Sequence, residues 1–347
     1  MISVGVIGCG YWGPNLVRNF AEAPRTRLAG ICDMNPQRVS SMAKRYPGVM
    51  ATDSVDDMLA SPDIDAIAIA TPVSSHFELA MKALRANKHV LVEKPLTTSS
   101  EQAYRLIDEA DKRNLVLMVD HTFVYTGAVR KIKQLVDAGQ LGKICYYDSV
   151  RVNLGLFQHD IDVIWDLAVH DMAIMDFIFD SRPVSITAVG MNHIEGAREN
   201  IAYITVLFEN DLIAHINVNW LSPVKMRRTL IGGSRQMIVY DDLDASEKVK
   251  VYDKGVTVTN RAESMYKMMI GYRSGDMHAP QLDVTEALRL EAQHFAECIE
   301  TGQQPVTDGA SGLKVVRMLE AATRSMRQQG APVALDTYEL RAVAASA

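Results

Sequence analysis

A glycine-rich segment near the start of the chain could bind the phosphates of a dinucleotide. Residues Val4–Gly13 read as a short apolar strand, the pattern GxGxxG and the beginning of a helix. We expect Gly8 to permit a tight turn, Gly10 to let the backbone approach a pyrophosphate, and Gly13 to let the helix pack against the strand. The free N–H groups and the positive dipole end of that helix would then face the phosphates. The predicted cofactor-binding residues of the loop are Gly8, Gly10, Tyr11, Trp12 and Gly13.

An acidic residue at the end of the next predicted strand completes this pattern. Asp33 follows the apolar run Leu28–Cys32, and a carboxylate there can accept hydrogen bonds from the adenosine ribose and repel a 2′-phosphate. NAD is therefore the predicted cofactor, in preference to NADP. Arg38 lies near in the sequence and could stack on the adenine or pair with a phosphate. The alternative is a glycine turn without a ligand, in which Asp33 only caps the following helix.

Three further side chains could carry out proton transfer. Asp166 and His170 are spaced i, i+4, so on an α-helix they would project from one face. A histidine titrates near neutral pH and can take a proton from a hydroxyl group. Lys94 follows a predicted parallel strand, and ligands of doubly wound sheets bind at the carboxyl ends of such strands. The alternatives are an Asp–His pair satisfied within its own helix and a surface lysine before a turn proline.

Histidine and acidic side chains also cluster between residues 159 and 171, which raises the question of a metal site. No pair in this cluster follows HExxH or another strong ligand spacing, so we expect no bound metal. Dialysis against a chelator, with activity measured before and after, tests this expectation. The residues of the cluster are His159, Asp160, Asp162, Asp166, His170 and Asp171.

The elements that must position these side chains follow two rhythms along the chain. Up to about residue 120, continuous apolar runs such as Ala66–Ala70 alternate with helix-like stretches such as Ser100–Lys112. This alternation is typical of a parallel sheet with helices on both faces. Between Ser185 and Tyr240, strand-like stretches follow one another with short polar turns, which predicts an antiparallel sheet. Further helices are expected near residues 126–138, 163–179, 287–301 and 309–328.

The length of 347 residues suits two domains. We place a dinucleotide-binding Rossmann domain at residues 1–120 and a domain for substrate binding and oligomerisation at residues 121–347. The composition, with 48% apolar residues, 22% charged residues and a net charge of −6, indicates a globular protein with no basic patch for nucleic acid. Scattered cysteines without a CxxC pair are typical of reduced thiols. With neither a signal peptide nor an apolar run of about 20 residues, we expect a cytoplasmic protein without a membrane partner.

Several motifs besides the glycine loop occur in a specific order. They are Ala70-Thr71-Pro72 with His76, Glu93-Lys94-Pro95, Trp165–Asp171, Glu291–Phe295 and Gly312–Val316. Together they resemble the Gfo/Idh/MocA oxidoreductases, the group of glucose–fructose oxidoreductase and inositol dehydrogenase, over essentially the whole chain. The resemblance implies an α/β fold class, with an N-terminal Rossmann domain and a C-terminal α/β domain that has a large, mostly antiparallel sheet. It also implies a homodimer or homotetramer, since that sheet commonly packs against a second subunit in the family.

The same resemblance implies a mechanism of alcohol oxidation. His170 would remove the hydroxyl proton, and Lys94, aimed by a cis bond to Pro95, would polarise that oxygen while a hydride leaves to the nicotinamide. Asp166 would hydrogen-bond the substrate, the histidine or the lysine. Glu93 would lie near the nicotinamide ribose, although a strand-end carboxylate in water is an equal alternative, and His76 could be only an N-terminal helix residue. The predicted cofactor-binding residues beyond the glycine loop are Asp33, Arg38, Thr71, Pro72, His76, Glu93 and Lys94.

Substrate specificity should come from polar residues after the first domain. The stretch 151–171 is most similar to family members that oxidise the 3-hydroxyl of a UDP-linked N-acetylated sugar to a ketone. Oxidation of inositol or a free sugar, and reduction of a keto-sugar by the same site, are alternatives that the catalytic residues do not separate. A non-catalytic NAD-binding regulatory protein is the alternative of another class. The predicted substrate-binding residues are His121, Tyr125, Arg151, Asn153, Gln158 and His159.

Overall fold

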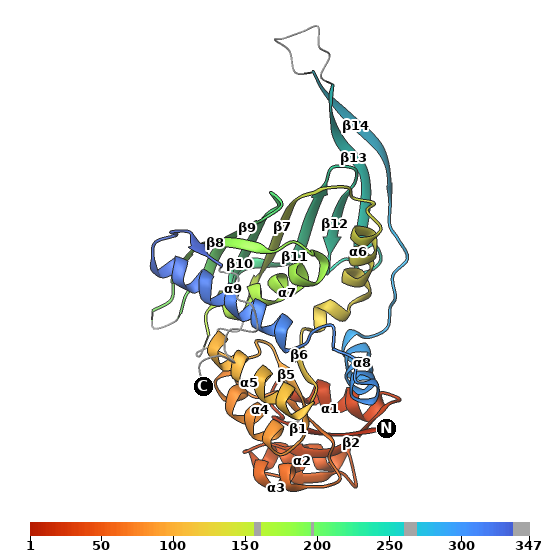
Figure 1. Cartoon of the computed structure of the whole chain (residues 1–347), viewed down its shortest axis with the longest axis vertical. Helices are drawn as coiled ribbons and strands as arrows, with labels where there is room; N and C mark the ends of the chain where they lie inside the picture. Colours follow the sequence, from red (N-terminus) through yellow and green to blue (C-terminus); the bar gives the residue numbers. More distant parts are fainter. Residues whose placement is uncertain (156–160, 196–197, 260–268, 336–347) are drawn as a thin grey trace. The chain divides into compact units, whose positions relative to one another are not determined.

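The computed structural model describes residues 1–155, 161–195, 198–259 and 269–335. Contacts within the chain divide it into two compact units (Figure 1). Unit 1 consists of Met1–Lys133, Val169–Ile178 and Gln281–Arg317. Unit 2 consists of Gln134–Ala168, Phe179–Pro280 and Met318–Ala347. These units are defined by contacts and each combines several segments of the chain. The predicted domains are two continuous ranges of sequence, so their boundary at residue 120 stays a prediction.

The sheet of unit 1 has six parallel strands in the order β3-β2-β1-β4-β5-β6. Every residue of β4 is completely buried, as expected for a strand covered on both faces. The order reverses between β1 and β4, and ligands of such sheets bind at this point, beyond the carboxyl ends of the strands. The predicted Rossmann sheet is confirmed. Its strands are β1 (Ile2–Ile7), β2 (Thr26–Cys32), β3 (Met50–Thr52), β4 (Ala66–Ile69), β5 (His89–Glu93) and β6 (Leu117–Asp120).

Helices cover the sheet of unit 1, where α4 packs against α5 and α1 packs against α8 (Figure 1). Local sequence fixes where they begin: the Asn35 side chain accepts the N–H groups of Gln37 and Arg38 and so caps α2. Helices α6 (Gly127–Asp137) and α9 (Gly309–Arg327) each begin in unit 1 and end in unit 2. The other elements of unit 1 are α1 (Gly13–Glu22), α2 (Pro36–Arg45), α3 (Val55–Ala60), η1 (Val73–Ser75), α4 (His76–Arg85), α5 (Ser100–Arg113), η2 (Thr122–Tyr125), α7 (Val169–Ile178) and α8 (Ala287–Thr301).

The sheet of unit 2 has the order β14-β13-β12-β11-β7-β10-β9-β8-β15 among the described residues. Only β7 and β10 pair in parallel, and every other neighbouring pair is antiparallel. The predicted fold class, with a large and mostly antiparallel second sheet, is therefore confirmed. The strands are β7 (Ile144–Leu154), β8 (Pro183–Met191), β9 (Ile201–Phe208), β10 (Ile213–Asn219), β11 (Leu221–Gly233), β12 (Met237–Asp241), β13 (Val249–Thr259), β14 (Met269–His278) and β15 (Val333–Ala334).

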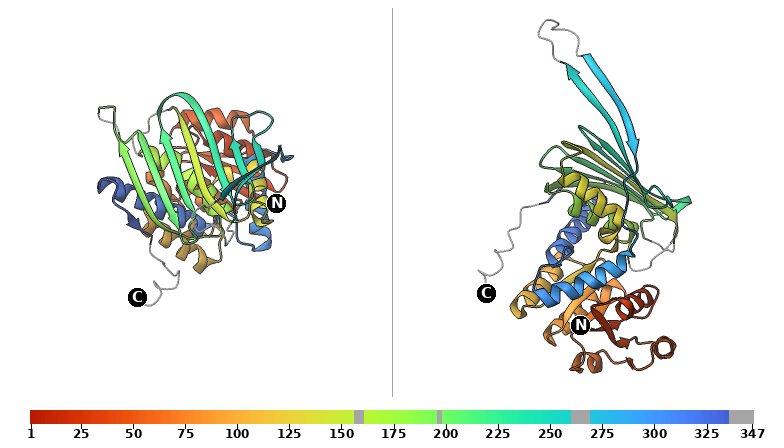
Figure 2. Two further views of the ribbon diagram at one scale, coloured as in Figure 1. Left: turned by 90° about the horizontal axis from the view of Figure 1, so that it is seen from above. Right: turned by 90° about the vertical axis from the view of Figure 1, so that its right-hand side faces the viewer.

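The two faces of this second sheet differ. Strands β9 and β10 alternate between buried and more exposed residues, which is the pattern of a sheet with one face in a core. The other face carries Val189, Met191, Tyr203, Leu207 and Ile213, each between 45% and 60% exposed. In the left view of Figure 2 the strands lie side by side with this broad surface of the sheet toward the viewer. A large apolar surface of this kind is typical of an interface.

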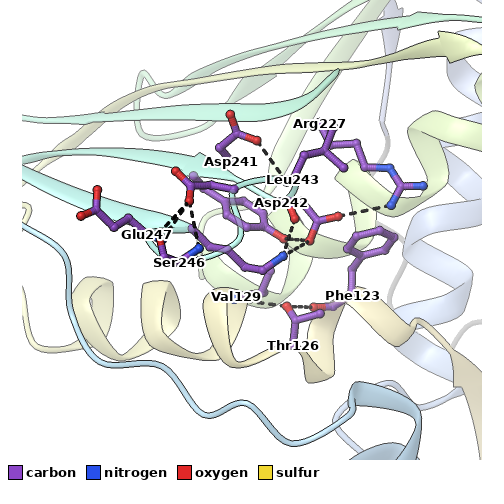
Figure 3. A network of polar contacts seen from close by, with 12 residues as sticks. Phe123, Thr126, Val129, Arg227, Asp241, Asp242, Leu243, Ser246 and Glu247 are labelled. Atoms are coloured by element: carbon purple, nitrogen blue, oxygen red, sulfur yellow. Dashed lines mark hydrogen bonds and ion pairs between the residues drawn. The ribbon is translucent and has the colours of Figure 1, made fainter. Parts of the chain in front are cut away.

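The turn from β12 to β13 is held by a polar network around Asp242 (Figure 3). Arg227 Nη1 donates to Asp242 Oδ2 over 3.2 Å, and the Tyr240 hydroxyl donates to Oδ1 over 3.2 Å. Lys248 Nζ lies 3.6 Å from Oδ1 and also donates to the Asp242 carbonyl. Three donors on one residue fix the start of the long β13–β14 hairpin.

Two features differ from the sequence prediction. A single α-helix was expected near 163–179, whereas the structure has a π-helical turn, η3 (Ile164–Ala168), followed by α7. Asp162 accepts the backbone N–H groups of Ile164 and Trp165 at its start, and hydrophobic periodicity does not distinguish a π turn from an α turn. The hairpin β13–β14 was missed because its strands contain charged and glycine residues instead of a continuous apolar run. Within the described ranges, no helix has the length and apolar character needed to cross a bilayer.

Candidate functional site

The three glycines of the loop after β1 have the distinct surroundings that phosphate binding requires. Gly8 has a φ of +98°, and a Cβ atom on it would lie 2.6 Å from the carbonyl oxygen of Ala70. A Cβ atom on Gly13 would overlap the carbonyl oxygen of Gly8. A Cβ atom on Gly10 would instead meet no close neighbour, since the nearest atom would be Arg38 Nη1 at 3.7 Å, an ordinary van der Waals distance. The loop therefore offers an uncovered backbone at Gly10, as close approach of a pyrophosphate requires.

The beginning of α1 lies at the same place. The Ala70 N–H donates to the Ile7 carbonyl, so the segments after β1 and β4 leave the sheet side by side. Trp12 stands at the N-cap of α1, no side chain caps the helix, and Pro14 occupies its first turn. Uncapped N–H groups and the positive end of the helix dipole favour an anion here. The residues present fit the diphosphate of NAD.

Asp33 closes the glycine loop onto β2. Its Oδ2 accepts the Cys9 N–H over 2.7 Å, and its Oδ1 accepts the Asn35 N–H over 2.8 Å. Arg38 Nη1 lies 3.7 Å from Oδ2. The carboxylate thus holds the loop, and it still has lone pairs for a ribose because each oxygen accepts more than one hydrogen bond. Arg38 partly balances the negative charge that would repel a 2′-phosphate.

His76 connects the segments that follow β4 and β5. Its imidazole is buried, with Nε2 lying 2.9 Å from the Thr71 carbonyl and Nδ1 lying 2.9 Å from the Pro95 carbonyl. The Ser75 hydroxyl donates to Thr71 Oγ1 over 2.7 Å, and Pro72 precedes the turn η1. The bond between Lys94 and Pro95 is cis. His76 therefore braces the backbone on both sides of the candidate site.

Lys94 and His121 follow neighbouring strands directly. Glu93 pairs in register with Asp120 at the ends of β5 and β6, so the next residues of both strands are adjacent. Burial lowers the pKa of His121 to about 4, although the charge of Asp120 raises it, and the Lys94 ammonium lowers it further. Neither ring nitrogen of His121 has a hydrogen-bond partner in the described part of the chain. His121 is thus a neutral, buried imidazole that the charge of Lys94 reaches.

His170 and Tyr125 both contact the η2 region of unit 1. The imidazole of His170 packs edge-on against Phe123, with ring centroids 4.8 Å apart. Tyr125 belongs to η2 itself, and its buried hydroxyl lies 3.2 Å from Thr307 Oγ1. Burial, followed by the charge of Glu291, raises the pKa of Tyr125 well above its ordinary value. The structure therefore places His170 beside the turn that follows β6, whereas the Tyr125 hydroxyl is engaged in the core.

Unit 2 holds the remaining predicted residues. The Asp166 carboxylate accepts a hydrogen bond from the buried Trp220 indole over 3.1 Å. Arg151 is buried on β7, opposite Val218 of β10, and Asn153 is half-buried two residues further along. Gln158 and His159 lie outside the described residues. Among the residues that are described, no group of three or more His, Cys, Asp or Glu side chains could hold a metal ion.

The glycine loop, Asp33, His76, Lys94, His121 and His170 all belong to unit 1, whereas Asp166 belongs to unit 2. Sequence reasoning missed Asp120, whose Oδ2 accepts the Trp12 indole N–H over 3.0 Å. It also missed the Trp220 donor. The signal for Asp120 was present, since this residue ends an apolar strand just as Asp33 follows one. Trp220 had no local signal, because its partner Asp166 is 54 residues away.

Comparison with known proteins gives matches along most of the chain. Residues 2–121 match the oxidoreductase family with an NAD-binding Rossmann fold, and residues 129–239 match the GFO/IDH/MocA C-terminal domain. The UDP-N-acetylglucosamine 3-dehydrogenase of Acidithiobacillus ferrooxidans is 30% identical over 90% of this chain and 93% of its own length. The scyllo-inositol 2-dehydrogenase (NAD(+)) of Bacillus subtilis is 24% identical over 96% of each chain.

Superposition on solved structures agrees with the family assignment of the fold. The Acidithiobacillus ferrooxidans enzyme superimposes with a TM-score of 0.79 and 27% identity, covering 94% of this chain and 98% of that one. An oxidoreductase from Agrobacterium radiobacter in complex with NAD+, L-tartaric acid and magnesium gives a TM-score of 0.78 at 19% identity, covering 96% and 98%. The family matches therefore cover an N-terminal and a C-terminal part of the chain, and the predicted NAD-binding class is confirmed.

Proposed function

The chain belongs to the Gfo/Idh/MocA family of NAD-binding oxidoreductases, and from this premise we propose that it oxidises the 3-hydroxyl of a UDP-linked N-acetylated sugar to a ketone. The observation that carries the substrate class is the 30% identity to a UDP-N-acetylglucosamine 3-dehydrogenase over 90% of the chain. The relatives also include inositol dehydrogenases and sugar reductases. All of these names describe chemistry at ring hydroxyls or ketones.

Lys94 and His170 take the principal roles in this proposal. His170 accepts the hydroxyl proton, and Phe123 supports the edge of its ring. The Lys94 ammonium hydrogen-bonds the reacting oxygen and stabilises its developing negative charge. Asp166, oriented by Trp220, keeps its predicted role as partner of the substrate or of these two groups. His121, neutral and without a partner among the described residues, is a donor for a substrate hydroxyl.

In the cofactor site, the chemistry belongs to the cofactor and the binding belongs to the protein. Bound NAD supplies the acceptor for the hydride from the substrate carbon. Gly8, Gly10 and Gly13 would hold its diphosphate at the start of α1, and Asp33 would hold the adenosine ribose. Thr71, Pro72 and Glu93 would border this region, and His76 holds the nearby carbonyls of Thr71 and Pro95. A sensor that only binds NAD needs the cofactor site but has no need of the lysine and histidine, which favours an enzyme.

A screen of substrates tests the proposal. NADH absorbance is followed with purified protein, NAD and a panel of UDP-N-acetylated sugars, free sugars and inositols. We expect the highest kcat/KM with a UDP-N-acetylated sugar. Turnover of an inositol or free sugar alone would move the assignment to that class, and NADH consumption with keto-sugars would fix the reverse direction. Absence of turnover with every compound, despite NAD binding, would favour the regulatory alternative.

We further propose a cytoplasmic homodimer or homotetramer that buries the apolar face of the second sheet. Tyr203 and Leu207 of β9 are central to that face, with Val189 and Ile213 opposite them in register. The four cysteines are free thiols, which suits a reducing compartment. Light scattering should give a mass of two or four chains, and Tyr203→Lys should shift it toward one chain. A wild-type mass of one chain would contradict this interface.

A further inference from the structure

A buried cluster of three carboxyl groups in unit 1 includes one residue with no role in the reaction proposed above. Glu93 ends β5, Asp120 ends β6, and Glu291 comes from α8. Glu93 and Asp120 are register neighbours, and Asp120 and Glu291 are 0% and 1% exposed. Three negative charges buried side by side would carry a large desolvation and repulsion cost. The cluster must therefore hold protons, hydrogen-bond donors or an opposite charge.

Asp120 is the member with donors. The Trp12 indole donates to its Oδ2 over 3.0 Å, and the Thr122 hydroxyl donates to its Oδ1 over 2.6 Å. Donors on both oxygens stabilise the carboxylate form. Because Trp12 lies in the glycine loop and occupies the N-cap position of α1, the orientation of Asp120 bears directly on the cofactor site.

The hydrogen-bonding surroundings of Glu291 differ from those of Asp120. Among the described residues neither of its oxygens has a hydrogen-bond donor, and the Asp120 side chain lies within hydrogen-bonding reach. Two ionised carboxylates can only accept, whereas a protonated carboxyl can donate to an ionised one. Burial, then the charge and hydrogen bond of Asp120, and then the charge of Glu93 raise the pKa of Glu291 well above its ordinary value. Burial and Asp120 raise the pKa of Glu93 in the same direction.

The other titratable groups around the cluster do not supply the missing donor. The Lys94 charge acts on Glu93, where it opposes the effect of burial. Tyr125 of η2 faces α8, but its hydroxyl lies against Thr307. Arg18 of α1, which also packs against α8, pairs with Glu286 over 2.6 Å. His121 donates no hydrogen bond to the cluster, because neither of its ring nitrogens has a partner among the described residues. The Lys94 charge opposes protonation of Glu93, whereas no positive charge opposes protonation of Glu291, so a proton on Glu291 is the favoured source of a hydrogen bond to Asp120.

We propose that Glu291 is a positioning residue of the cofactor site: its protonated carboxyl donates to Asp120 and holds Asp120 in place to accept the Trp12 indole. Protonation of Glu291 removes one of the three negative charges that the cluster would otherwise carry beside Lys94. This role rests on the proposed function only in so far as the glycine loop binds NAD. A glutamine at position 291 would be a permanent donor of nearly the same size, whereas a leucine would leave an acceptor of Asp120 without its donor.

Infrared spectroscopy of the purified protein tests the proton directly. At pH 8 the wild type should show the C=O stretch of a buried carboxylic acid, and Glu291→Gln should lose part of that band. Glu297→Gln, the same change at an exposed position of α8, should leave the band unchanged. Absence of the band in the wild type, or a full band in Glu291→Gln, would overturn the proposal.

NADH binding and turnover then test the positioning role. Glu291→Gln should keep the NADH Kd within about twofold of wild type, and Glu291→Leu should raise it about tenfold, the order expected when a buried acceptor loses its donor. Equal NADH binding in the leucine and glutamine variants would overturn the role. Neither measurement needs a sugar substrate, so a wrong substrate class would leave both results standing. With the substrate found, the loss in Glu291→Leu should appear in the KM for NAD more than in kcat.

Discussion

Alanine at Gly10 should weaken NAD binding without destabilising the protein. The nearest atom to a Cβ at this position is Arg38 Nη1 at 3.7 Å, an ordinary van der Waals contact, and the φ of Gly10 is outside the left-handed region. The free energy of unfolding should therefore change by less than about 1 kcal/mol, with a small gain possible from the stiffer unfolded chain. In the complex, the methyl group would stand between the loop and the pyrophosphate. Overpacking of this kind costs about 1–3 kcal/mol, equivalent to a rise in Kd of about 5- to 150-fold.

Gly13→Ala is the matched comparison, because it should destabilise the fold whereas Gly10→Ala should not. Its Cβ would overlap the Gly8 carbonyl oxygen, so the backbone must move and the free energy of unfolding should fall by about 3 kcal/mol or more. Gly48→Ala is the control for backbone strain, since Gly48 has a φ of +87° with nothing near a Cβ; it should cost about 1 kcal/mol and leave NAD affinity unchanged. Calorimetric titration measures the Kd, and thermal unfolding measures stability. If Gly10→Ala bound NAD like wild type, the assignment of Gly10 to the pyrophosphate would be refuted.

Three further predictions use other contacts of the site. Asp33→Ala removes both the ribose acceptor and the bond to the Cys9 N–H, so NAD should bind about tenfold more weakly and NADP relatively better; a wild type that already prefers NADP in titrations would contradict it. Burial raises the pKa of Asp162 from 3.8 to about 6, so the folded state keeps this proton longer and stability should fall as pH rises through that range, by up to about 3 kcal/mol. Asp162→Asn should abolish this loss in denaturant titrations across pH, and an unchanged pH dependence would exclude Asp162 as its source. Trp220→Phe removes the donor to Asp166 and should lower kcat/KM about tenfold with NAD affinity intact; a weaker NAD Kd with normal kcat would contradict that role.

The sequence was most informative where a local pattern determines the structure. Continuous apolar runs predicted the buried parallel strands, and the glycine spacing predicted three backbone environments that the structure shows separately at Gly8, Gly10 and Gly13. Local patterns were insufficient for η3, because the apolar positions of a π turn and an α turn overlap over five residues. The cap that starts η3, Asp162, was noted only as a member of the acidic cluster.

The features that the sequence did not predict depend on contacts between residues far apart in the chain. Asp120 meets Trp12 across 108 residues, and Trp220 meets Asp166 across 54. Glu291 belonged to a recognised motif, but its chemistry depends on the burial and on Asp120, which only the packing of α8 provides. Residues that act by orienting other residues carry little signal of their own in a single sequence.

The central claim, oxidation of a UDP-linked N-acetylated sugar by NAD with Lys94 at the reacting oxygen, is tested most directly by one measurement. NADH formation is followed after mixing UDP-N-acetylglucosamine and NAD with wild type or Lys94→Ala, while NAD affinity is measured for both proteins by titration. We expect NADH from the wild type, a loss of at least about a hundredfold in kcat for Lys94→Ala, the order of an oxyanion-stabilising group, and equal NAD affinity. Wild-type kcat in Lys94→Ala, or no NADH from the wild type, would contradict the account.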